Sequence, residues 1–110
     1  MALDIDSLVR PMVQAASASL GKTWPGVAKY ATQQFEYTAT TLVMIEEDSV
    51  AGTITQAQAQ SLLDAQKLAT QNVMLALQTM SLVAIQNAIN AALGAIKTAV
   101  NTAVGFTLIA

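Results

Sequence analysis

The stretch from Leu68 to Ile96, LATQNVMLALQTMSLVAIQNAINAALGAI, contains no charged residue and constrains this chain more than any other feature. About twenty apolar residues are enough for a transmembrane helix, so its length permits a membrane span. Six amide residues interrupt it: Gln71, Asn72, Gln78, Gln86, Asn87 and Asn90. Because an unpaired amide is costly in hydrocarbon, a lone span is disfavoured. The segment is expected in the centre of a bundle, at a subunit interface, or in an oligomer in lipid.

The polar residues of this region gather on one side of a helical wheel drawn at about 100° per residue. They are Asp64, Lys67, Gln71, Gln78, Gln86, Asn90, Lys97 and Asn101. Several stand eleven residues apart, such as Gln86 with Lys97 and Asn90 with Asn101, and this spacing stays close to the period of a straight helix. The rest of the circumference is apolar, which predicts a helix that is covered on most sides.

Composition indicates that the surface is short of charge. The 110 residues suit a single domain, residues 1–110, yet only 11% are charged, against about 25% in an average protein. A small domain has much surface relative to its volume, so some apolar surface is expected to meet a partner or lipid. The net charge of −2 and the five dispersed cations offer no basic stripe for phosphates. We therefore expect no nucleic-acid partner.

Catalytic, metal and cofactor sites are not expected. The chain has no cysteine and no histidine, which removes thiol chemistry, the usual zinc sites and the commonest general base. The acidic run before Gly52 lacks the further carboxylates of a calcium loop, and no nucleophile stands beside a base. Asp4 and Asp6 occupy positions where a signal peptide is positively charged. The expected location is the cytoplasm or an assembled particle, with membrane association as an alternative.

Hydrophobic periodicity predicts an all-α fold, an antiparallel helical hairpin or bundle of three to four helices with a long C-terminal helix. The predicted helices cover residues 4–20, 26–50, 55–93 and 95–108. The clearest boundary is a turn at residues 49–54, where Gly52 tolerates a left-handed conformation. Thr55 and Gln58 then form a capping box that opens the next helix.

The helical pattern after Thr55 is so long that it is compatible with two overall arrangements of the chain. Unbroken from Thr55 onward, it would span about 80 Å, whereas a compact chain of this size has a radius of gyration of about 13 Å. Either the helix bends, for which Gly94 is the candidate, or the molecule is an elongated hairpin. We favour the compact bundle, in which residues 27–50 pack on 56–80 and the N-terminal helix packs on the C-terminal segment.

Two short segments resemble known families. Trp24-Pro25-Gly26 is similar to the Trp-x-Gly turn of the WXG100 family of small helical hairpins, although that turn is central in the family and lies a quarter of the way along this chain. Residues 79–91, TMSLVAIQNAINA, resemble parts of the Ala-, Gln- and Asn-rich subunits of bacterial R-bodies, which are coiled protein ribbons. The second resemblance implies self-assembly.

These observations predict a non-enzymatic structural or interaction protein that binds itself or other subunits of an assembly through its C-terminal helix. The predicted contact residues are Leu75, Leu82, Ile85, Ile89, Leu93, Ile96, Phe106 and Leu108, with Gln78, Gln86 and Asn90 setting the register. The uncharged C-terminal sequence VGFTLIA is expected to be docked, for example in a neighbouring subunit. The alternative is a membrane-active hairpin of the holin or pore-former type that inserts residues 68–96 as an oligomer.

Overall fold

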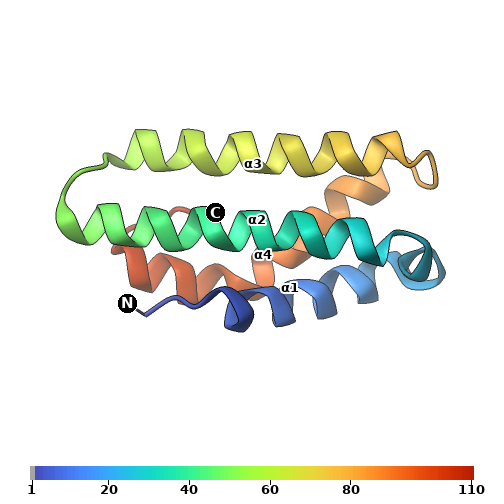
Figure 1. The fold of residues 1–110 in the computed structure, drawn as a ribbon, viewed down its shortest axis with the longest axis horizontal. Coiled ribbons are helices and arrows are strands. Elements are labelled where there is room, and N and C mark those ends of the chain that lie inside the picture. The colour runs from blue at the N-terminus through green and yellow to red at the C-terminus, as the bar shows by residue number, and fades with distance from the viewer. Residues whose placement is uncertain (1) are drawn as a thin grey trace.

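The computed structural model describes residues 2–110, and this part of the chain is all-helical (Figure 1). Four α-helices follow one another in it, α1 (Ile5–Leu20), α2 (Trp24–Ala51), α3 (Gln56–Ala76) and α4 (Leu82–Val104), with a short 3-10 turn η1 (Gly21–Thr23) before α2. The radius of gyration is 13.6 Å and the extents are 42 × 22 × 20 Å. The prediction of a compact all-α bundle is therefore confirmed.

Local sequence chemistry accounts for the helix starts. The Asp4 carboxylate caps α1 by accepting hydrogen bonds from the backbone N–H and the hydroxyl of Ser7, and these bonds lower the pKa of Asp4 below its usual value. Thr55 and Gln58 form the predicted capping box, with reciprocal bonds of 3.0 and 2.9 Å. Gly52, at φ 72°, ends α2 in a left-handed conformation, as predicted.

The predicted helices 55–93 and 95–108 are wrong, because the helix breaks at residues 77–81. Helix α3 ends at Ala76, and α4 begins at Leu82 and continues through Gly94 to Val104. Gln78 adopts the left-handed conformation with φ 56°, and the Ser81 side chain caps α4 by accepting from the N–H of Ala84 at 3.1 Å. Within residues 2–110, no helix is long and apolar enough to cross a membrane.

Burial of the apolar face of α4 explains why the chain turns at residues 77–81. A continuous helix would carry the apolar face of residues 85–104 beyond the reach of the first half of the chain. By turning back at Gln78, the chain buries Ile85, Ile96 and Val100 almost completely. Each such side chain contributes about 1.5–3 kcal/mol when buried, which exceeds the cost of one left-handed residue, about 1–2 kcal/mol.

The helices contact one another unequally. Helix α4 packs mainly on α1, and α2 lies between α1 and α3, whereas α3 has fewer contacts with α4. This matches the expected pairing of the N-terminal helix with the C-terminal segment and of residues 27–50 with 56–80. Helix α3 contributes only four buried residues to the core, Ala59, Leu63, Thr70 and Met74. One side of α3 therefore stays separated from α4, and this gap becomes the candidate site.

The position of the break can be tested at Gly94. This glycine is exposed within α4, and a Cβ built there meets no atom within 4 Å. Gly94→Ala should raise the free energy of unfolding by about 0.5–1 kcal/mol, because alanine restricts the unfolded chain and favours helix. Urea denaturation measures the change. A destabilised variant would mean that the chain bends at Gly94.

The complementary substitution is Gln78→Gly, at the residue that does turn. Glycine adopts a positive φ without steric penalty, so this variant should be more stable than the parent by up to about 1 kcal/mol. Gln33→Gly, at an exposed position inside α2, is the matched control and should be less stable than the parent. Equal losses in both variants would contradict a left-handed Gln78.

Candidate functional site

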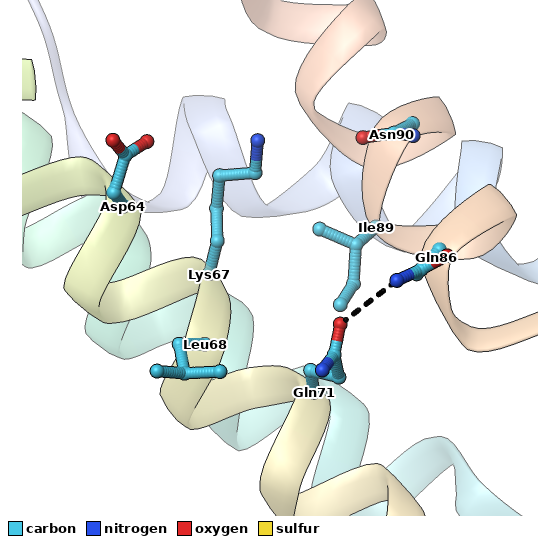
Figure 2. Close-up of a pocket in the computed structure, with 7 residues that line it drawn as sticks. All are labelled: Asp64, Lys67, Leu68, Gln71, Gln86, Ile89 and Asn90. Atoms are coloured by element: carbon cyan, nitrogen blue, oxygen red, sulfur yellow. Dashed lines mark hydrogen bonds between the residues drawn. The ribbon is translucent and has the colours of Figure 1, made fainter. Parts of the chain in front are cut away.

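An open groove separates α3 from α4. Its walls are Asp64, Lys67, Leu68 and Gln71 from α3 and Gln86, Ile89 and Asn90 from α4, and they enclose about 360 Å³ (Figure 2). At one end, the Gln86 Nε2 donates a hydrogen bond of 3.3 Å to the Gln71 Oε1 and ties the two helices together. The site is therefore polar at its rim and has Leu68 and Ile89 as apolar neighbours.

The groove is formed by the polar stripe seen in the sequence. On one continuous helix, Gln71 and Gln86 would lie along the same side and point the same way. The turn at 77–81 instead reverses the chain, so the α3 half of the stripe faces the α4 half across the groove (Figure 2). Five of the eight predicted stripe residues line this groove, whereas Gln78, Lys97 and Asn101 do not.

Lys67 occupies the middle of this groove. It lines the hollow of Figure 2, a second hollow of about 500 Å³ beside Leu108 and Ile109, and a small interior gap near Phe35. Within residues 2–110 its ammonium group makes no ion pair, and the nearby Asp64 carboxylate instead accepts a hydrogen bond of 3.0 Å from Gln60. Lys67 is thus a half-buried cation with donors available toward the groove.

The C-terminal tail, residues 105–110, lies in the other half of the groove. After Gly105 the chain runs back toward the middle of the molecule (Figure 1), and Leu108 and Ile109 are buried. The Asn101 Oδ1 accepts from the N–H groups of Leu108 and Ile109, both at 2.9 Å, while its Nδ2 donates to the Ile109 carbonyl at 2.8 Å. The docked end was predicted, but it docks on its own chain.

The predicted contact residues divide into two groups. Leu75, Gln78, Leu82, Gln86 and Asn90 are exposed. Ile85, Ile89, Leu93, Ile96 and Leu108 are buried in the chain's own core, and Phe106 packs half-buried against it. The expectation that these six residues face a partner is therefore withdrawn. Helical periodicity identified the apolar face of α4 but not its partner, which is α1.

Exposed residues without charge also lie at the bend between α3 and α4. We call this region the uncharged end and define it as Leu75, Gln78, Leu82 and Val83. No charged residue occurs between Leu68 and Ile96. By contrast, the exposed stripe Tyr30, Tyr37 and Met44 on α2 is accompanied by the exposed charges Lys29, Glu36 and Glu47.

Sequence reasoning missed the role of Glu46. This carboxylate is buried near the end of α2, where it accepts hydrogen bonds from the backbone N–H groups of Ala2 and Leu3, each at 3.0 Å. It holds the N-terminal segment so that Leu3 joins the core. Its partners are backbone groups, which carry no residue-type signal, and the one available signal was helical spacing, which places Glu46 four residues after Leu42 on the buried face of α2.

The described residues of the groove carry groups that suit binding through hydrogen bonds. Among residues 2–110 no cluster of three metal-ligating side chains occurs. The groove presents side-chain amides and one ammonium group, which donate and accept hydrogen bonds. No known family, curated protein or solved structure matches this chain. The candidate site therefore rests on its geometry.

The role of Asn101 can be tested by replacing it with alanine. Asn101→Ala removes three hydrogen bonds to the tail, and at about 1 kcal/mol each the free energy of unfolding should fall by about 2–3 kcal/mol. Amide hydrogen exchange at Leu108 and Ile109 should become fast. Asn87→Ala, an exposed amide on α4, is the control and should change stability by less than about 0.5 kcal/mol. Unchanged exchange would contradict a clamp at Asn101.

Proposed function

We propose that this protein is a structural or interaction protein that associates with copies of itself through the uncharged end and the adjoining amides Gln86 and Asn90. In this proposal α3 and α4 act as an antiparallel helical hairpin whose bend forms the contact surface. The observation that carries the proposal is the exposure of Leu75, Leu82 and Val83 near a bend whose sequence contains no charged residue.

The chemistry of this surface favours an identical partner. A surface without charge selects a partner that is also uncharged, because burying a partner's unpaired charge is costly. Side-chain amides both donate and accept hydrogen bonds, so Gln78 or Gln86 of one copy can pair with the same residue of another. A symmetric dimer uses one patch on both subunits and requires this self-complementarity.

The free energy available is moderate. Leu75 and Leu82 are each exposed over roughly two fifths of their surface, so covering them recovers about 1 kcal/mol per side chain. Val83 adds a similar amount. Since both copies contribute, these side chains alone supply several kcal/mol against the entropic cost of association. This energy suits an assembly in which each subunit contacts more than one neighbour.

No feature of the described structure specifically favours the alternative, in which residues 68–96 insert into lipid. These residues form two helices separated by the turn at 77–81, and no helix in residues 2–110 is long and apolar enough to span a bilayer. Liposome flotation of the full chain provides a direct comparison, and strong binding to neutral vesicles would favour that alternative.

The proposal predicts that Leu82→Asp disrupts self-association. Leu82 is 43% exposed and is the first residue of α4, where an aspartate is compatible with the helix dipole, so folding should be preserved. Light scattering coupled to size exclusion, at tens of micromolar protein, should show an oligomer for the parent chain and a monomer for the variant.

The matched control is Leu62→Asp. Leu62 is 47% exposed on α3, on the half of that helix nearer the Gly52 turn, so the variant introduces the same charge at a similar exposure away from the uncharged end. It should associate like the parent chain. A monomeric parent, or equal loss of association in both variants, would refute the proposal.

A further inference from the structure

Helix α4 is built from two similar eleven-residue segments. Residues 82–92 read LVAIQNAINAA and residues 93–103 read LGAIKTAVNTA. Six positions are identical, namely Leu82/Leu93, Ala84/Ala95, Ile85/Ile96, Ala88/Ala99, Asn90/Asn101 and Ala92/Ala103. Eleven residues make three turns of helix, so corresponding side chains lie on the same face about 16 Å apart. The two segments therefore present nearly the same surface twice.

The second segment already holds a peptide, which is the chain's own tail. Asn101 binds the backbone at Leu108 and Ile109 with both its oxygen and its nitrogen. Leu108 and Ile109 border a hollow of about 500 Å³ whose other walls include Leu93 of α4 and Leu63 and Lys67 of α3. The tail held in this way is a short non-helical segment with large apolar side chains and no charged side chain.

The first segment presents the same amide with nothing on it. Asn90 is exposed beside the 360 Å³ hollow, and Figure 2 shows it across the groove from Lys67. Leu82, which corresponds to Leu93, is 43% exposed, whereas Leu93 is only 5% exposed. Lys67 and Asn90 also line the hollow next to the tail, so the open half continues directly from the half that the tail occupies.

We propose that the open half of the groove between α3 and α4 binds a short, uncharged, non-helical peptide segment of a partner protein, with Asn90 binding its backbone as Asn101 binds the tail. The occupant carries an apolar side chain that covers Leu68, which is exposed. Lys67 donates to one of its backbone carbonyls, because its ammonium group has three donors and makes no ion pair within residues 2–110.

This groove lies within one chain, but it shares Gln86 and Asn90 with the proposed self-association surface, so peptide binding and self-association are measured separately. The test uses a peptide with the sequence of residues 105–110, GFTLIA, carrying an N-terminal fluorescein and a C-terminal amide. Fluorescence anisotropy is recorded with nanomolar peptide and the full chain, at protein concentrations where light scattering shows a single species. We expect saturable binding of one peptide per chain.

The variants identify the site. Asn90→Ala should weaken binding about tenfold, because the peptide backbone loses its hydrogen bonds to the Asn90 side chain. Asn87→Ala is the matched control, because Asn87 is an exposed amide of α4 that does not line the groove, and it should bind like the parent. Circular dichroism confirms that both variants are folded.

Three results would overturn the inference. The first is no binding to the parent chain at millimolar protein. The second is equal affinity of the parent and Asn90→Ala. The third is a change in affinity in Asn101→Ala but not in Asn90→Ala, which would show that the peptide only replaces the tail. If Asn90→Ala abolishes self-association while the peptide fails to bind, the occupant is a second copy and the peptide proposal is wrong.

Discussion

The reversal of the chain between Leu77 and Ser81 is the constraint on which the rest of the structure depends. It places the apolar face of α4 against α1 and thereby completes the core. The same reversal turns the two halves of one polar stripe toward each other, so that Gln71 meets Gln86. Because α3 and α4 have fewer contacts with each other than α4 has with α1, the gap between them leaves room for the groove and for the C-terminal tail. Core and groove thus have a common origin.

Both ends of the described chain are held by polar side chains that bind backbone groups. Glu46 accepts from the N–H groups of Ala2 and Leu3, and Asn101 both accepts from and donates to the tail. Non-helical segments lack internal partners for their backbone groups, and such groups are costly to bury unpaired. A single carboxylate or amide supplies those partners, which lets Leu3, Leu108 and Ile109 enter the core.

Features that depend on neighbours in sequence were predictable, and features that depend on distant neighbours were not. Gly52 and the Thr55–Gln58 capping box are local, and both are as predicted. The break at Gln78 has no glycine or proline to mark it, and it exists because a continuous helix would leave Ile85 and its neighbours uncovered. Gly94 was the predicted bend because glycine is a weak helix former. It does not break α4, since a helix tolerates an exposed glycine at a modest cost in stability. Likewise, Asn101 was recognised as polar, but its backbone partners carry no sequence signal.

The structure also changes the argument from composition. A low charge content suggested that much of α4 must be covered by a partner, yet α1 covers most of its apolar face. The uncharged surface left over is smaller and is concentrated at one end of the molecule and along one groove. Such concentration matters, because scattered exposed leucines are ordinary in proteins, whereas adjoining ones without charge favour binding. The eleven-residue repeat in α4 adds a second argument. Asn101 in one copy holds the tail, whereas the corresponding Asn90 in the other copy lines an open hollow. A side chain that holds a non-helical segment of its own chain, as Asn101 does, is a better guide to function than hydrophobicity alone.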